Sequence, residues 1–91
     1  MNVFEIEELE DVLVIEKLSS KLVVHNDEVN TFDFVIESLI EVCSHTWEQA
    51  EQCSLFIHHK GKCTVKQGDW EKLAEMRTQI CNAGISAEVL D

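Results

Sequence analysis

Hydrophobic residues change their spacing several times along this chain after residue 20. Residues 22–24 form a short apolar run, typical of a buried strand, and the turn formers Asn26 and Asp27 follow it. After Asn30 and Thr31, either of which can cap a helix, apolar residues recur three and four positions apart. This spacing predicts an amphipathic helix whose apolar face contains Phe32, Val35, Ile36, Leu39, Ile40 and Cys43.

A second helix is predicted to begin at Thr46 and to end at Gly61. Gln49 stands three residues after Thr46, which is the spacing of a capping box, and glycine commonly ends a helix. The positions expected to face inward are Ala50, Cys53, Ser54, Ile57 and His58.

The last third of the chain predicts a strand, a helix and a strand. Residues 62–67 and 85–90 alternate polar and apolar side chains. Between them Asp69 can cap a helix that Gly84 closes, and its apolar spacing runs through Trp70, Leu73, Met76, Arg77 and Ile80. The order is therefore β-α-α-β-α-β. We expect an α+β domain with three helices on one face of a small, three-stranded antiparallel sheet.

The first twenty residues differ in composition from the rest. They carry six carboxylates against one lysine, which is −5 of the total net charge of −11. We expect residues 1–20 to form a mobile acidic extension, with one apolar patch at 12–15 that could become a strand, and residues 21–91 to form the core domain. The acidic balance argues against nucleic acid and against anionic membranes as partners, and it favours a basic partner or a cationic ligand.

Targeting and cysteine patterns point to the cytoplasm. The first eleven residues are acidic and lack the basic region and apolar run of a signal peptide, and no apolar stretch is long enough to cross a membrane. The cysteines contain no C-x-x-C pair, so neither a zinc site nor a disulfide framework is predicted. We expect no metal and no cofactor, and we expect four buried free thiols at Cys43, Cys53, Cys63 and Cys81.

Two polar groups stand out beside apolar residues. The turn of Asn26, Asp27 and Glu28 follows the first strand, and His58 comes near the end of the second helix. An amide oxygen, carboxylates and an imidazole that converged beside apolar side chains could hold a cationic amine with a hydrophobic neighbour. In a domain of this size a shallow surface pocket is expected. The plainer alternatives are a simple strand-ending turn and an ordinary core histidine bonded to a backbone carbonyl.

These residues resemble a known family. The element order, the Val-His-Asn-Asp-Glu turn at 24–28, the Thr-Phe-Asp-Phe-Val-Ile-Glu-Ser-Leu helix start at 31–39 and the Ile-His-His-Lys-Gly-Lys helix end at 57–62 closely resemble the ClpS adaptor family. The resemblance covers residues 22–90. Such adaptors are not enzymes. The resemblance implies an adaptor that binds N-degron proteins, whose first residue is Phe, Leu, Trp or Tyr, and delivers them to the AAA+ unfoldase of the Clp protease.

The resemblance also assigns roles to residues. Asn26, Glu28 and His58 would accept hydrogen bonds from the terminal ammonium, with Asp27 nearby. The hydrophobic pocket would be lined by Val24, His25, Asn30, Phe32, Val35, Ser54, Ile57 and Ile85. The chain departs from the family pattern in three places: Glu28 replaces an aspartate, Asn30-Thr31-Phe32 replaces Thr-Pro-Met, and Ser54 replaces a methionine.

Two alternative hypotheses concern other function classes. A Cys-His hydrolase would use Cys53 with His58, but five helical residues place them about 140° apart around the axis, too far for a nucleophile–base pair. A generic interaction domain, similar to the C-terminal domain of the ribosomal stalk protein, would not need Asn26 and His58 to converge.

Asp33, Glu37 and Glu41 are interpreted as a solvated face, with docking to the unfoldase near Lys60 and Lys62 as the alternative.

Overall fold

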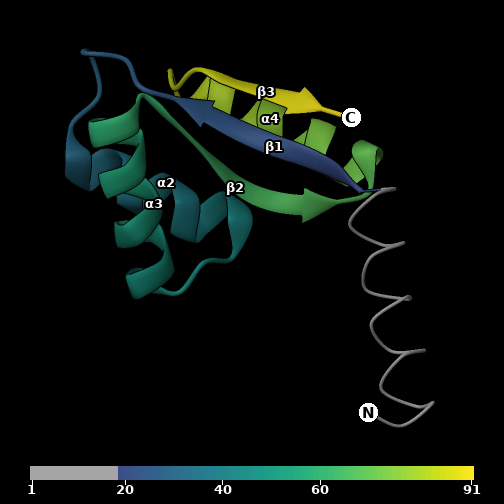
Figure 1. The fold of residues 1–91 in the computed structure, drawn as a ribbon, viewed down its shortest axis with the longest axis horizontal. Helices are drawn as coiled ribbons and strands as arrows, with labels where there is room; N and C mark the ends of the chain where they lie inside the picture. The colour runs from purple at the N-terminus through teal and green to yellow at the C-terminus, as the bar shows by residue number, and fades with distance from the viewer. Residues whose placement is uncertain (1–18) are drawn as a thin grey trace, which may run out of the picture.

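The computed structural model describes residues 19–91 and contains six regular elements (Figure 1). Residues 1–18 of the extension predicted at 1–20, including its apolar patch at 12–15, lie outside the described residues. The order β-α-α-β-α-β is confirmed, with β1 at Ser20–His25, α2 at Phe32–Cys43, α3 at Trp47–Lys60, β2 at Lys62–Gly68, α4 at Trp70–Asn82 and β3 at Ala87–Leu90.

The three strands form one antiparallel sheet with β1 in the centre. The strand order is β2-β1-β3, and in Figure 1 β1 runs between the other two with α4 behind the sheet. The register between β1 and β2 shifts between Leu22 and Val23, which leaves Val65 as the extra residue of a bulge in β2. Alternate residues of a strand share a face, so Leu22 and Val24 point to the same side of the sheet.

A single apolar core joins that side of the sheet to all three helices. Leu22 and Val24 are completely buried, and Val65 is nearly so. The helical and loop members of the same cluster are Ile36, Leu39, Cys43, Ala50, Ile57, Leu73, Ile80 and Ile85. The helices therefore share the core on one side of the sheet, as predicted for an α+β domain.

Local signals set the helix ends. Thr31, rather than Asn30, caps α2, because its Oγ1 accepts a hydrogen bond from the backbone N–H of Phe34 at 3.1 Å. The predicted capping box at the start of α3 is confirmed, and Gly61 ends α3 in a left-handed conformation with φ 90°. Asp69 occupies the cap position of α4, although its side chain makes no capping hydrogen bond.

The prediction of four buried thiols is only partly correct. All four cysteines are free, but only Cys43 is buried, Cys53 and Cys63 are half-buried, and Cys81 is exposed. Cys81 follows Ile80, which points into the core, and the next residue of a helix faces about 100° away. Its Sγ lies 3.7 Å from the Ala87 carbonyl oxygen. Burial raises the pKa of the Cys43 thiol to about 11, so this thiol stays protonated.

Candidate functional site

One cavity of about 430 Å³ opens where the end of β1, the start of α2, the end of α3 and the segment before β3 meet. All twelve residues predicted for the site line it. Among residues 19–91 its lining contains nothing outside that set, which consists of Val24, His25, Asn26, Asp27, Glu28, Asn30, Phe32, Val35, Ser54, Ile57, His58 and Ile85.

Backbone hydrogen bonds bring these segments together. The N–H of His25 donates to the Ser86 carbonyl oxygen at 2.9 Å, and the N–H of Asn26 donates to the Gly61 carbonyl oxygen at 2.8 Å. Gly61 in turn donates to the Ile57 carbonyl oxygen at 3.0 Å. The chain leaving β1 is thereby tied to the last turn of α3. Asn26 and His58, which are far apart in the sequence, come to line the same cavity for this reason.

The turn after β1 is organised around the Asp27 carboxylate. Its Oδ1 accepts hydrogen bonds from the backbone N–H groups of Val29, at 3.1 Å, and Asn30, at 3.0 Å. The side-chain amide of Asn30 donates to both carboxylate oxygens, at 2.8 and 2.9 Å, and also to the Gly84 carbonyl oxygen at 2.8 Å. Asn30 therefore links the turn to the segment that leads into β3.

These hydrogen bonds stabilise the ionised form of Asp27. Burial raises the pKa of the carboxyl group, but the hydrogen bonds from Asn30 and Val29 outweigh that effect, and the pKa lies below its usual value. Both carboxylate oxygens of Asp27 already accept hydrogen bonds. Asp27 therefore contributes negative charge to the site and holds the shape of the turn, and it is less suited to accept a further hydrogen bond from a ligand.

The floor of the cavity is apolar. Val24, Ile57 and Ile85 are each at most 4% exposed, and they come from β1, from α3 and from the segment before β3. Phe32 and Val35, from the first turns of α2, also line the cavity, and Phe32 is 39% exposed. A bulky apolar group entering the cavity would therefore meet aliphatic and aromatic side chains from four separate segments.

The polar end of the cavity is open to solvent. Asn26, Glu28 and His58 are all exposed. The prediction that His58 faces inward with the core stripe of α3 is wrong in this respect, because the last turn of the helix reaches the cavity mouth. His59 is also exposed, as predicted, and its ring meets the His58 ring edge-on, with centroids 5.1 Å apart.

The surroundings of the histidines distinguish the two interpretations of His58, as an acceptor for an amine or as a core histidine bonded to a backbone carbonyl. His45 fits the plainer one, because its Nε2 bonds to the Val65 carbonyl oxygen at 2.7 Å. The ring nitrogens of His58, by contrast, have no hydrogen-bond partner within residues 19–91. His58 is therefore not a core histidine bonded to a carbonyl. Its ring nitrogens are available at the polar end of the cavity.

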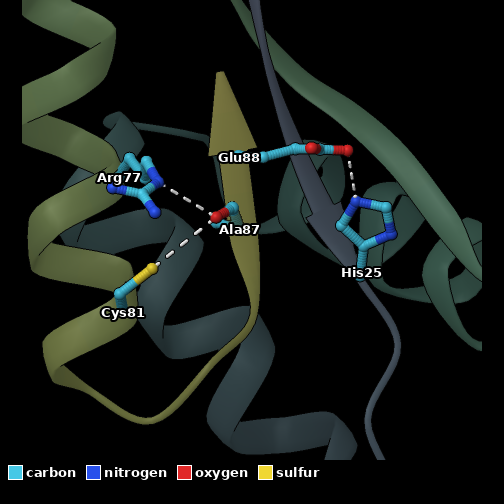
Figure 2. Close-up of polar contacts among 5 residues, drawn as sticks. All are labelled: His25, Arg77, Cys81, Ala87 and Glu88. Atoms are coloured by element: carbon cyan, nitrogen blue, oxygen red, sulfur yellow. Dashed lines mark hydrogen bonds and ion pairs between the residues drawn. The ribbon is translucent and has the colours of Figure 1, made fainter. Parts of the chain in front are cut away.

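His25 lines the cavity from the end of β1, but its ring is directed toward β3. Figure 2 shows Nε2 of His25 meeting the Glu88 carboxylate, at 2.7 Å. On the other side of β3, Arg77 of α4 donates from Nε to the Ala87 carbonyl oxygen at 3.2 Å. Strand β3 is thus held between β1 and α4, which fixes the preceding segment that carries Ile85.

Within residues 19–91, no three His, Cys, Asp or Glu side chains are grouped so that they could hold a metal ion. None of the helices between residues 19 and 91 is both long and apolar enough to cross a membrane.

Comparison with known proteins gives a consistent result. The family model described as ATP-dependent Clp protease adaptor protein ClpS matches residues 16–88. A ClpS adapter protein of Campylobacter jejuni is 42% identical over 53 residues, which are 58% of this chain and only 55% of that relative. This chain therefore aligns with about half the length of that protein. A ClpS adapter protein of Oleidesulfovibrio alaskensis is 32% identical over 84 residues, covering 86% of this chain and 78% of the relative.

A solved structure shares the fold. The structure of Agrobacterium tumefaciens ClpS2 bound to L-phenylalaninamide superposes with a TM-score of 0.65. The match covers 78% of this chain and 95% of that chain, at 18% sequence identity. At this identity the likeness concerns the architecture alone.

Proposed function

The chain belongs to the family of ATP-dependent Clp protease adaptor proteins, ClpS, and from that premise we propose that it captures proteins by their first residue. In this proposal the cavity binds the free α-amino group together with a bulky hydrophobic first side chain, and the adaptor passes the captured protein to the AAA+ unfoldase of the Clp protease in the cytoplasm. The observation that carries the proposal is the cavity itself, with its polar mouth and apolar floor.

The polar mouth suits an ammonium group. A free α-amino group has a pKa of about 7.7–8.0, so near neutral pH it is mostly a cation with three N–H donors. The side chains of Asn26, Glu28 and His58 offer acceptors at the mouth, and Asp27 adds a negative charge. Each hydrogen bond to a charged group contributes about 1.5–3 kcal/mol. An acetylated terminus loses the charge and most of these donors.

The apolar floor suits one large side chain. Full burial of a Phe or Leu side chain contributes about 1.5–3 kcal/mol. After the cost of association, the amine contacts and the buried side chain together give an affinity on the order of micromolar. Such an affinity is useful for a carrier, since the adaptor has to release its cargo. The L-phenylalaninamide bound by the Agrobacterium relative also combines a free amine with an aromatic side chain.

Two other function classes are less well supported. A generic interaction domain does not require Asn26 and His58 to meet, yet both line one cavity. A Cys-His hydrolase requires a nucleophile in the cavity, and Cys53 is not among the residues that line it. We therefore propose a binding protein without catalytic activity. Asp33, Glu37 and Glu41 are exposed, which fits their interpretation as a solvated face. Docking of the adaptor to the unfoldase is a separate part of the proposal.

The proposal is tested by fluorescence anisotropy with short labelled peptides that differ only in the first residue. Peptides beginning with Phe, Tyr, Trp or Leu should bind, and those beginning with Ala or Glu should not. N-terminal acetylation should abolish binding, because it removes the cation. A reporter protein with a bulky first residue should then be degraded by the Clp protease only when the adaptor is present. Equal binding of Ala- and Phe-initiated peptides would refute first-residue recognition.

Phe32 is expected to filter the shape of the first side chain. Phenylalanine has two side-chain torsions and a flat, stiff ring, whereas the methionine usual in the family is flexible. Aromatic contacts contribute about 0.5–1.5 kcal/mol beyond burial. We expect the aromatic first residues to bind at least as tightly as Leu, and we expect Ile and Val to bind poorly. The change Phe32→Ala should admit Ile and Val.

The same helix supplies a matched control for this prediction. Phe34 is 38% exposed, close to the 39% of Phe32, but it does not line the cavity. Phe34→Ala should leave the ranking of first residues unchanged in the anisotropy series. If the wild-type protein preferred Leu over every aromatic residue by more than about tenfold, a difference of roughly 1.4 kcal/mol, then Phe32 would not face the cargo.

A further inference from the structure

One buried hydroxyl in the cavity wall lacks a hydrogen-bond partner. Ser54 of α3 lines the cavity and is only 2% exposed, yet its Oγ makes no hydrogen bond within residues 19–91. The other such side-chain atom in this part of the chain, Nδ1 of His45, belongs to a residue outside the cavity lining. Because an unpaired buried polar group costs free energy, most are paired in native proteins. A hydroxyl left unpaired beside a cavity can be satisfied by a ligand.

Other helical hydroxyls in the described chain show the ordinary arrangement. In α2 the Oγ of Ser38 donates to the carbonyl oxygen of Phe34 at 2.8 Å. In α4 the Oγ1 of Thr78 donates to the carbonyl oxygen of Ala74 at 3.0 Å. Both use the acceptor one turn earlier in their own helix. Ser54 does not, so its hydroxyl keeps both a donor and an acceptor for a partner in the cavity.

The position of Ser54 suits the far end of a bound side chain. Ser54 and His58 lie four residues apart, on the same face of α3 and separated by about 6 Å along its axis. His58 is at the polar mouth, where the amine is proposed to bind. A side chain that leaves the α-carbon there and runs along α3 brings its tip toward Ser54. This separation is comparable with the length of a tyrosyl side chain from its α-carbon to its hydroxyl.

We propose that Ser54 makes this site selective for tyrosine over phenylalanine as the first residue of the cargo. This inference deepens the proposed function and rests on it. The phenolic O–H of tyrosine both donates and accepts, so it pairs with the Ser54 hydroxyl whichever way that hydroxyl is turned. The ring packs against Val24, Ile57 and Ile85 in either case. Phenylalanine leaves the buried hydroxyl unpaired and gains no compensating contact.

The test compares three peptides that differ only in the first residue: tyrosine, phenylalanine and para-methylphenylalanine. The methyl group matches the size of the phenolic hydroxyl but makes no hydrogen bond. For the wild-type protein, tyrosine should bind about fivefold more tightly than either of the others, the ratio given by one net hydrogen bond. A fourth peptide with acetylated tyrosine reports on amine recognition separately.

Variants of Ser54 test whether its hydroxyl causes the preference for tyrosine. Ser54→Ala should remove the tyrosine preference, so that tyrosine and para-methylphenylalanine bind equally to this variant, whereas Ser54→Thr, which retains a hydroxyl, should keep the preference. Ser38→Ala is the matched control, because it deletes a buried helical hydroxyl that does not line the cavity. It should keep the wild-type preference.

The outcomes separate the two proposals. If tyrosine, phenylalanine and para-methylphenylalanine bound equally and acetylation abolished binding, the role of Ser54 would be overturned and amine recognition would stand. If no peptide bound, or if acetylation had no effect, the proposed function itself would fail. Should Ser54→Ala not fold, the wild-type comparison of tyrosine with para-methylphenylalanine still decides, because equal affinities contradict the inference.

Discussion

Replacing His58 with alanine is expected to lower the affinity for a peptide with a free, bulky first residue by about tenfold to a hundredfold. The expected loss follows from one hydrogen bond to a charged group, about 1.5–3 kcal/mol. The ring nitrogens of His58 have no hydrogen-bond partner within the described chain and lie at the polar end of the cavity. The loss should appear in anisotropy titrations at pH 7.5, without a matching loss of thermal stability, because His58 is exposed.

His59 provides the control for this measurement. It is exposed and adjacent to His58, but it does not line the cavity. His59→Ala should retain the wild-type affinity at pH 7.5. If His58→Ala bound the peptide as tightly as the wild-type protein, then His58 would not contact the terminal amine.

Replacing Asp27 with alanine is expected to reduce both stability and binding. Its carboxylate accepts hydrogen bonds from the backbone of Val29 and from the backbone and side chain of Asn30. Their loss should lower the free energy of unfolding by about 1–2 kcal/mol. Affinity should fall by about tenfold, because the turn that presents Asn26 and Glu28 loses its anchor and the site loses a negative charge. Chemical denaturation and anisotropy measure the two effects separately.

The sign of the pH effect on stability follows from the lowered pKa of Asp27. A carboxyl group whose pKa is lower in the folded state contributes stability above its unfolded pKa and loses it as the pH falls through the folded value. Wild-type stability should therefore drop more steeply than that of Asp27→Ala below pH 3.8, the usual value for this group. The control Glu37→Ala removes an exposed carboxylate of α2 and should change stability by less than about 0.5 kcal/mol. Equal acid profiles for wild type and Asp27→Ala would contradict the assignment.

Much of the fold could be predicted because its signals are local. The capping box of Thr46 and Gln49 and the glycine at position 61 are short-range patterns, and the structure confirms both. The residues around the cavity were predicted from the resemblance to the ClpS family. That resemblance indicates which distant chain segments lie next to one another, and local patterns cannot.

What could not be predicted depends on contacts between distant segments. Asn30 reaches the carbonyl oxygen of Gly84, 54 residues away, and this bond helps to fix the Asp27 turn. The family resemblance placed Asp27 near the amine acceptors, and the structure shows that both of its carboxylate oxygens already accept hydrogen bonds from Asn30. Helical periodicity placed His58 on the inward face of α3. It could not indicate that the buried face of α3 ends at Ile57, one residue before His58.

Because the cavity is built from several chain segments, ligand binding is coupled to folding. Its walls come from β1, α2, α3 and the segment before β3, and hydrogen bonds from His25 and Asn26 join three of these parts. No single segment keeps the site when the others come apart, so a ligand binds the folded chain and not the unfolded one. A cargo present at 100 times its dissociation constant then adds about 2.7 kcal/mol to the unfolding free energy. Under the proposed function, the loaded adaptor therefore resists unfolding better than the empty one at the moment when it meets the unfoldase.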